Sequence, residues 1–232
     1  MNHKCMTAGN TLKGTRTERS RIKIKVGQRM NKTYLSIKRI IDAILSATAL
    51  ICLAPLFLAL IIAVKIDDPG NAFFTQKRVG KGKKHFALYK FRSMKTSTPH
   101  EMPTHMLENP EQYITKVGGF LRKTSLDELP QIWNILKGDM AVVGPRPALW
   151  NQFDLIEERD KYGANDILPG LTGWAQINGR DELPIDVKAK FDGEYVRRVS
   201  FKFDVEIFLK TIFKVLRKDG VVEGGTGSLE KK

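Results

Sequence analysis

The chain has 232 residues, enough for one domain and a shorter appendage, because about 150 residues already bury a self-sufficient core. Lysine and arginine outnumber the acids 39 to 25, and the net charge of +14 attracts nucleic acid, anionic lipid headgroups or phosphorylated substrates without choosing among them. Two cysteines, Cys5 and Cys52, and four scattered histidines exclude a disulfide framework and a zinc-binding spacing.

The two ends of the chain are polar. Residues 1–31 carry eight basic side chains and one acid, Glu18, and have almost no apolar periodicity. This composition favours a disordered basic arm over residues 1–31. Residues 219–232 are interpreted as a polar tail.

An uncharged run of 22 residues, 43–64, is long enough to cross about 30 Å of hydrocarbon as a helix. Pro55 lies near its middle, where it removes a backbone hydrogen bond and clashes with the carbonyl four residues earlier, so a bend is expected there. Both flanks are basic, so the charge imbalance that orients a spanning helix is missing. We therefore predict a re-entrant membrane helix over residues 32–66, broken at Ala54 and Pro55. A straight span kinked by proline and a buried core helix are the alternatives.

Residues 67–218 are expected to form a small cytosolic domain. Two apolar stretches, 72–75 and 85–89, surround a turn rich in glycine and lysine, which predicts a short β-hairpin near the membrane surface. Residues 97–115 contain three prolines and are expected to form a long surface loop.

Helical periodicity returns in two later segments. Over residues 120–136 we predict a helix with Ser125 as its N-terminal cap, the following acids in its first turn and Gly138 as its stop. Residues 201–218 form a basic amphipathic helix, which suits either the membrane interface or packing against the domain. The predicted fold is α+β and mostly helical, with interfacial amphipathic helices.

Two adjacent carboxylates, Asp127 and Glu128, follow a basic turn. Taken singly, such a pair is more often a partner of the helix dipole. A carboxylate can also attack phosphorus or hold a divalent metal that neutralises a transferred phosphoryl group. The basic residues in the same part of the chain favour this second interpretation.

Basic side chains in three places suit the binding of phosphate. Lys90 and Arg92 flank a phenylalanine just after the predicted hairpin, Arg122 precedes the two acids, and Arg146 lies between two prolines. Arginine forks bind phosphate in a bidentate manner, so these three arginines are candidates to clamp a pyrophosphate.

Five motifs then occur in a fixed order: KFRSM at 90–94, LDELPQ at 126–131, NILKGDM at 134–140, GPRP at 144–147 and PGLTGWAQINGR at 169–180. With these motifs the chain resembles the bacterial sugar transferase family of monotopic phosphoglycosyltransferases over residues 32–218. The resemblance implies a re-entrant membrane helix at the cytoplasmic face of the bacterial inner membrane and a catalytic domain over residues 67–218.

The resemblance also implies a covalent, two-step transfer of a sugar-1-phosphate from a UDP-sugar to undecaprenyl phosphate, with release of UMP. This would be the first membrane step of polysaccharide or glycoconjugate assembly. Asp127 would be the nucleophile on the β-phosphate and would hold Mg²⁺ together with the phosphates. Glu128 would help to deprotonate or position the polyprenyl phosphate. Lys90, Arg122 and Arg146 match basic positions that the family uses around substrate phosphate.

The last motif contributes two further candidates for substrate binding, Gln176 and Arg180. They rest on the resemblance and on a loop suited to close ligand approach; a structural turn cluster is the alternative. The family often has a serine before the kinking proline, whereas this chain has Ala54, so a hydroxyl bond that would support the bend is missing.

The expected partners are a polyprenyl phosphate, a nucleotide diphosphate sugar and inner-membrane lipids, without nucleic acid; the oligomeric state is left open, a homodimer included. A membrane-tethered nucleic-acid-binding protein is the alternative that the net charge favours, but the sequence lacks a helix-turn-helix, zinc or RNA-reading signature. A noncatalytic membrane scaffold is a third hypothesis.

Overall fold

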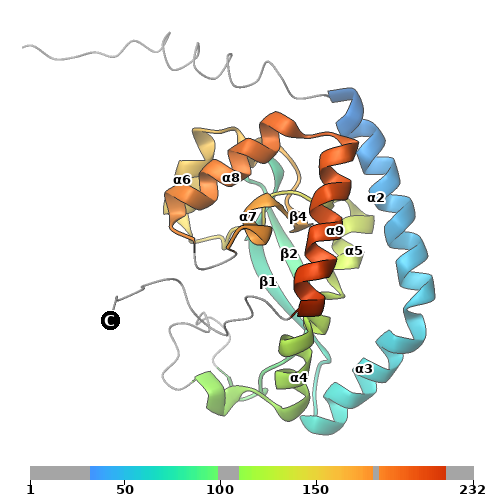
Figure 1. The fold of residues 1–232 in the computed structure, drawn as a ribbon. Helices are drawn as coiled ribbons and strands as arrows, with labels where there is room; N and C mark the ends of the chain where they lie inside the picture. Colours follow the sequence, from blue (N-terminus) through green and yellow to red (C-terminus); the bar gives the residue numbers. More distant parts are fainter. Residues whose placement is uncertain (1–31, 99–109, 180–182, 218–232) are drawn as a thin grey trace, which may run out of the picture.

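A computed structural model describes residues 32–98, 110–179 and 183–217 of the chain, so the predicted arm at 1–31 and tail at 219–232 lie outside it. The described residues form an α+β fold that is mostly helical and has two small sheets, as the sequence predicts. A bent pair of long helices runs along one side of a body of shorter helices and strands (Figure 1).

The helix pair consists of α2 (Lys32–Cys52) and α3 (Ala54–Asp67), which meet at Leu53. Pro55 lies in the first turn of α3, where its missing N–H is tolerated because the first amides of a helix have no partner in any case. The two helices are bent by 63° relative to each other, so the predicted break at Ala54 and Pro55 is confirmed.

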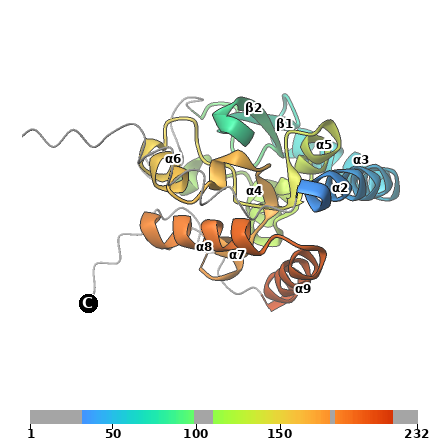
Figure 2. The same cartoon turned by 90° about the horizontal axis from the view of Figure 1, so that it is seen from above.

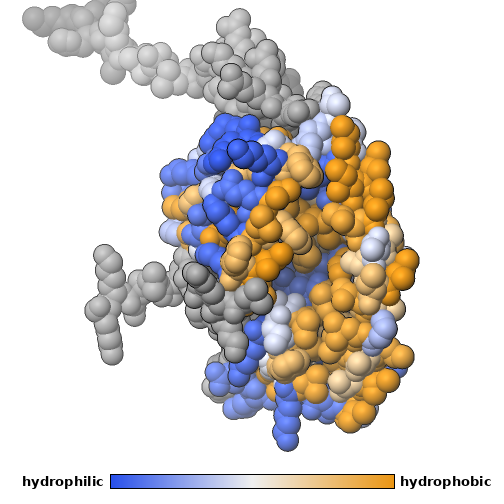
Figure 3. All heavy atoms as spheres, turned by 45° about the vertical axis from the view of Figure 1, so that its right-hand side comes forward, coloured by the Kyte–Doolittle hydropathy of each residue, from blue (hydrophilic) through white to orange (hydrophobic). Residues whose placement is uncertain are grey.

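Within the described residues, no single helix has both the length and the apolar character to cross a membrane, but α2 and α3 meet those criteria as a bent pair. Apolar side chains are exposed along both helices: Ile37, Ile40, Ile44, Leu45, Ile51, Leu58, Ile62 and Ile66. Figure 3 shows apolar residues gathered on the face of the molecule that carries this pair.

The predicted hairpin is confirmed. Strands β1 (Phe73–Val79) and β2 (His85–Phe91) pair in antiparallel register, with the turn η1 (Lys81–Lys83) between them. Gly82 in that turn has φ of 65°, a conformation that glycine adopts without steric cost. A second sheet was not predicted: β3 (Ala141–Val143) and β4 (Gly170–Thr172) form a short parallel pair. Strands of three residues are too short to show periodicity.

The helix predicted over residues 120–136 is wrong in its continuity. Helix α4 (Lys116–Thr124) ends at Ser125, a short turn η4 (Leu126–Glu128) follows, and α5 (Gln131–Lys137) then begins. Ser125 therefore closes α4 in a left-handed conformation, with φ of 56°, and does not cap a helix start. The left-handed residue interrupts the helical path, which resumes only beyond Pro130. The predicted stop at Gly138 is confirmed, with φ of 99°.

The remaining helices are α6 (Phe153–Asp160), α7 (Trp174–Ile177), α8 (Ile185–Arg198) and α9 (Phe201–Arg217). Seen from above, α7, α8 and α9 lie on the side of the body opposite the hairpin (Figure 2). Most of the loop predicted at 97–115 lies outside the described residues; the part at Pro110–Tyr113 is a short 3-10 helix, η3.

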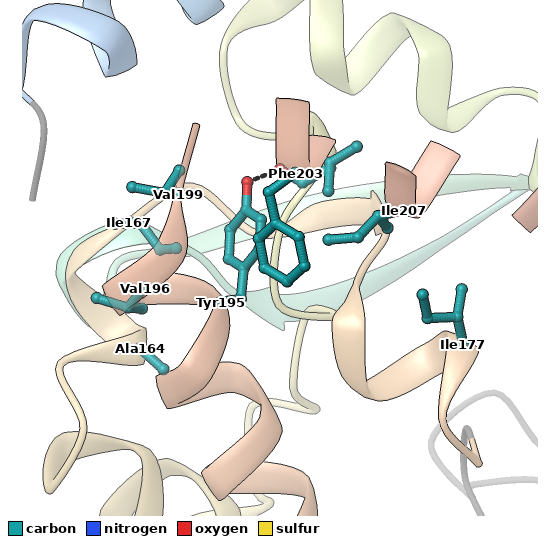
Figure 4. Close-up of a cluster of buried hydrophobic side chains, with 9 residues drawn as sticks. Ala164, Ile167, Ile177, Tyr195, Val196, Val199, Phe203 and Ile207 are labelled. Carbon is teal, nitrogen blue, oxygen red and sulfur yellow. Dashed lines mark hydrogen bonds between the residues drawn. The ribbon is translucent and has the colours of Figure 1, made fainter. Parts of the chain in front are cut away.

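Helix α9 is amphipathic, as predicted. Its inner residues Phe203 and Ile207 are buried in a core cluster with Tyr195 of α8 (Figure 4). The single hydroxyl proton of Tyr195 is shared between the carbonyl oxygen of Val143 at 3.0 Å and Oδ1 of Asp204 at 2.8 Å. Its outer face exposes Phe201, Val205, Phe208, Leu209, Ile212 and Phe213. The core therefore ties α8 and α9 to β3, the strand that leads into the GPRP motif.

Candidate active site

Asp127 and Glu128 lie in the short turn η4, facing strand β2. The residues on either side, Leu126 and Leu129, pack against a cluster that contains Phe91 of β2. Because these apolar neighbours are held in the core, the carboxylates between them have a fixed direction. Asp127 is 9% exposed, so both its burial and its neighbours affect its chemistry.

Two cationic side chains from other parts of the chain contact the acids of this turn. The Nζ of Lys90 lies 3.0 Å from Oε1 of Glu128 and 3.7 Å from Oδ2 of Asp127. The Nη2 of Arg146, from the GPRP motif, lies 2.8 Å from the same Oε1 of Glu128. The structure thus brings four of the predicted site residues together, and Glu128 is the more closely paired of the two acids.

The two carboxylates have opposite electrostatic surroundings. Burial raises the pKa of Asp127; the charge of Lys90 opposes this rise and the charge of Glu128 adds to it. Burial acts on Glu128 in the same direction, but Arg146 and Lys90 outweigh it and hold the pKa of Glu128 well below its usual range. Glu128 is therefore an anion whose charge is balanced by two cations, whereas Asp127 is the more basic carboxylate.

Arg122 lies at the margin of this cluster. It belongs to the last turn of α4, and its Nε donates to the Ser93 hydroxyl at 2.9 Å. Its positive charge also lowers the pKa of Asp127, which places it within electrostatic reach of the carboxylates. Arg122 thus remains a candidate for phosphate binding.

Arg92 is held elsewhere. Its guanidinium pairs with the carboxylate of Asp68 and donates to the main-chain oxygen of the same residue, just beyond the end of α3. Within the described residues, these contacts give Arg92 a structural partner and do not direct it to Asp127 or Glu128. The predicted role of Arg92 in phosphate binding therefore has no support in the geometry.

Gln176 lies in α7, behind the GPRP motif. Its Nε2 donates to the Leu171 carbonyl at 3.0 Å, and its buried Oε1 has no hydrogen-bond partner in the described part of the chain. The adjacent strand β4 supports the loop that carries Arg146: Gly144 N donates to Thr172 O at 2.8 Å. The last motif thus holds the Arg146 loop in place. Arg180 lies outside the described residues.

Sequence reasoning missed one residue beside the site. Asn134 of α5 is fully buried; its Oδ1 accepts from Tyr89 N at 3.0 Å and its Nδ2 donates to Ala87 O at 2.8 Å. These bonds tie α5 to β2 immediately before Lys90. The NILKGDM motif contains Asn134, but nothing in its local pattern identifies a partner 45 residues away.

Asp127 and Glu128 are the two acidic side chains of this cluster. Within the described residues, no group of three or more His, Cys, Asp or Glu side chains is placed to bind a metal ion. Mg²⁺, however, commonly binds through one or two carboxylates together with the substrate's phosphates. Asp127, whose contact with Lys90 is the longer one, fits that use.

The fold and the site define a small α+β domain, tied to a bent apolar helix pair, with a carboxylate pair among cations. A comparison with known protein families identifies the class more closely: the family described as bacterial sugar transferase matches residues 33–218. The chain belongs to this family. The family model match supports a transferase over the nucleic-acid-binding alternative.

Three relatives illustrate the similarity. The UDP-glucose:undecaprenyl-phosphate glucose-1-phosphate transferase of Xanthomonas campestris pv. campestris is 39% identical over 79% of this chain and 39% of its own length. The UDP-N-acetylgalactosamine-undecaprenyl-phosphate N-acetylgalactosaminephosphotransferase of Aeromonas hydrophila is 38% identical over 79% of this chain and 44% of its own length. EpsL of Bacillus subtilis (strain 168), an uncharacterized sugar transferase, is 38% identical over 80% of this chain and 90% of its own length. The chain thus spans about two fifths of the length of the first two relatives and most of EpsL.

Proposed function

We propose that this protein transfers a sugar-1-phosphate from a UDP-sugar to undecaprenyl phosphate through a covalent intermediate on Asp127. The observation that carries this proposal is the unequal pairing of the two acids: Lys90 and Arg146 neutralise Glu128, whereas Asp127 has one cation at 3.7 Å. A buried and more basic carboxylate is the better nucleophile toward phosphorus. The names of two relatives, which include UDP-sugars and undecaprenyl phosphate, supply the substrate classes.

In the first step, an Asp127 carboxylate oxygen attacks the β-phosphorus of the UDP-sugar. A new P–O bond forms to Asp127, the bond between the β-phosphorus and the bridging oxygen breaks, and UMP leaves with that oxygen. Lys90 and Arg146 lie beside the carboxylates, where they would stabilise the negative charge that develops on the phosphoryl oxygens. Arg122 would add to this stabilisation from the margin of the site.

In the second step, a phosphate oxygen of undecaprenyl phosphate attacks the same phosphorus. The P–O bond to Asp127 breaks, the carboxylate is regenerated, and undecaprenyl diphosphate sugar is the product. Glu128 is a weak base, because the two cations hold its pKa well below the usual range despite its burial. We therefore assign Glu128 to positioning Lys90 and Arg146 around the phosphates, in preference to deprotonating the acceptor.

A divalent cation such as Mg²⁺, when bound at Asp127 and the substrate's phosphates, would neutralise phosphate charge. The residues of the chain bind the remaining charge and orient the nucleophile. Activity is expected to disappear when EDTA is added and to return with excess Mg²⁺. Full activity in EDTA would remove the metal from this proposal.

We further propose that the bent pair α2 and α3 inserts as a re-entrant helix from the cytoplasmic face of the inner membrane. The exposed apolar faces of the pair and of α9 support this placement (Figure 3). Single cysteines introduced at Thr33 and Lys83 should both react with a membrane-impermeant label from the cytoplasmic side. Labelling from opposite sides would indicate a straight span.

The sugar stays open, since relatives of nearly equal identity, 39% and 38%, are named for glucose and N-acetylgalactosamine. The proposed function is tested by incubating the purified full-length protein with undecaprenyl phosphate, Mg²⁺ and a panel of UDP-sugars, and by measuring the UMP released. At least one UDP-sugar is expected to give UMP and a lipid-linked sugar in equal amounts. Release of UDP in place of UMP would contradict transfer of a sugar-1-phosphate.

A further inference from the structure

Arg39, on α2, reaches out of the proposed membrane helix into the catalytic domain. Its Nη1 donates to the Ile135 carbonyl at 2.7 Å and its Nη2 donates to the Leu136 carbonyl at 2.7 Å. These carbonyls belong to the last turn of α5, where carbonyl oxygens have no N–H donor within the helix; Ile135 O also accepts from Gly138 N at 3.1 Å. A cation at this end also interacts favourably with the helix dipole.

Gly138 provides the space for this contact. It closes α5 with φ of 99°, and a Cβ atom built there would lie 3.1 Å from Nη2 of Arg39. The residue that ends α5 is thus also the residue that lets the guanidinium approach the carbonyls. The fork geometry of arginine makes two such bonds at once, which a lysine cannot reproduce.

At its other end, α5 starts at Gln131, three residues after Glu128, so α5 is a short rigid link between α2 and the carboxylates. Asn134, in the middle of α5, is fully buried and bonds to Ala87 O and Tyr89 N of β2, directly before Lys90. A shift of α5 relative to α2 would therefore move the acids and Lys90 together. The bonds of Arg39 oppose that shift.

The two substrates differ in how they reach the site. A UDP-sugar is dissolved in water and can reach the site at any height above the membrane. The phosphate of undecaprenyl phosphate is confined to the bilayer surface, so it meets Asp127 only if the carboxylate is held at the right height above the membrane. A displacement of about 1 Å can cost about 100-fold in rate when reacting groups must align.

We propose that Arg39 is a positioning residue that fixes the height of the carboxylate pair relative to the bilayer and so serves the step that uses the lipid acceptor. This inference rests on the proposed function and on insertion of α2 and α3. It assigns Arg39 no contact with substrate. Its effect passes through α5 to Asp127 and Lys90.

The test compares the two half-reactions in full-length protein reconstituted in vesicles of anionic phospholipid. With UDP-sugar and no acceptor, Arg39→Gln should form the covalent phosphosugar adduct at a rate within about threefold of wild type, because this half-reaction needs no alignment with the bilayer. With undecaprenyl phosphate added, the same variant should transfer the sugar at least about tenfold more slowly. Arg39→Lys keeps the charge and loses the fork, so its transfer rate should lie between those of wild type and Arg39→Gln.

Two controls separate positioning from general damage. Lys65→Gln removes an exposed cation of α3 that forms no side-chain salt bridge or hydrogen bond within the described residues, and it should behave as wild type. A short, water-soluble prenyl phosphate is not confined to the bilayer. With this acceptor, the logarithm of the fold loss in transfer rate caused by Arg39→Gln should be less than half of its value with undecaprenyl phosphate.

Three results would overturn the inference: an unchanged transfer step, an equal loss in both half-reactions for Arg39→Gln and Arg39→Lys, or an equal defect with the short and the long acceptor. If Arg39→Gln does not fold, the comparison of the two half-reactions in Arg39→Lys decides. A wild-type protein that makes no adduct and no product would instead contradict the proposed function, so the two failures are distinguishable.

Discussion

Two regions of the molecule bury an aspartate beside a lysine, and they differ in how completely the acid is paired. Asp204 of α9 accepts a hydrogen bond from Tyr34 at 2.6 Å and another from Tyr195 at 2.8 Å, and its Oδ2 lies 2.8 Å from Lys38 Nζ. Within the described residues, Asp127 has one ion pair, a 3.7 Å contact with Lys90.

Under the proposed function, the difference separates a structural carboxylate from a reactive one. A buried acid whose oxygens are all occupied by donors holds elements together, here α2, α8 and α9. A buried acid with little pairing keeps a high basicity and an oxygen that can meet a substrate. The predictions that follow apply matched substitutions to the two regions.

The largest effect is expected for Asp127→Asn. An amide is neither a nucleophile toward phosphorus nor a good Mg²⁺ ligand, so turnover should fall by at least about 1000-fold. UMP release under saturating substrate measures this. Turnover within about tenfold of wild type would show that Asp127 is not the nucleophile.

The same variant should be more thermostable than the wild type at pH 7. The folded protein raises the pKa of Asp127, so the stabilisation that the protonated form provides is complete below the unfolded pKa and is lost as the pH rises through the folded pKa. A neutral amide avoids that loss. The Tm of Asp127→Asn should therefore exceed that of wild type at pH 7, and the gap should narrow in acid.

Asp204→Asn makes the same chemical change in the fully paired region and should have the opposite effect on stability. It removes one of the two carboxylates beside the buried ammonium of Lys38, leaving only Asp42 at 3.4 Å, which costs about 2 kcal/mol. The Tm should fall, whereas adduct formation per folded molecule should change little because Asp204 is remote from the reaction. If Asp127→Asn and Asp204→Asn both lowered the Tm, the contrast between the two regions would be wrong.

Glu128→Gln should have an intermediate effect on activity. The amide no longer neutralises Lys90 and Arg146, so their orientation around the phosphates is weakened. We expect adduct formation and transfer to undecaprenyl phosphate both to slow, by about 100-fold each, because Lys90 and Arg146 act on the phosphates in both steps. Single-turnover measurements of the two steps check this; normal adduct formation with slow transfer alone would instead assign Glu128 to the lipid acceptor.

The smallest effect is a shift in pH dependence. Burial raises the pKa of Asp127, with a further rise from the charge of Glu128, so adduct formation should fall in acid at a pH above the ordinary range of an aspartate. Glu128→Gln removes that charge and should move the acidic limb of the profile to lower pH. An acidic limb at the same pH in both proteins would contradict electrostatic coupling between the acids.

Local signals predicted much of this fold. Pro55 identified the bend, the turn at Gly82 identified the hairpin, Gly138 identified a helix end, and the apolar period of α9 identified an amphipathic helix. Each of these depends on residues close together in the chain. The break at Ser125 escaped prediction because a left-handed serine has no distinctive local pattern.

The candidate site was predicted through motifs, and what the sequence did not show are the distant partners of its residues. The sequence predicted one site that contains Lys90, Asp127, Glu128 and Arg146, and the structure places these residues in contact. It could not show that Arg92 pairs with Asp68, because that pairing depends on where α3 ends relative to β2. The contacts of Arg39 and Lys38 were missed for the same reason: their partners lie 96 and more residues away.

Intact-protein mass spectrometry tests the central claim most directly. Full-length protein is mixed with Mg²⁺ and its UDP-sugar in the absence of lipid acceptor, and the mass is measured before and after undecaprenyl phosphate is added. The account predicts a mass increase equal to one phosphosugar in wild type, its loss on addition of acceptor, and no increase in Asp127→Asn. A wild-type protein that makes product without any trapped adduct, together with an active Asp127→Asn, would contradict the covalent mechanism.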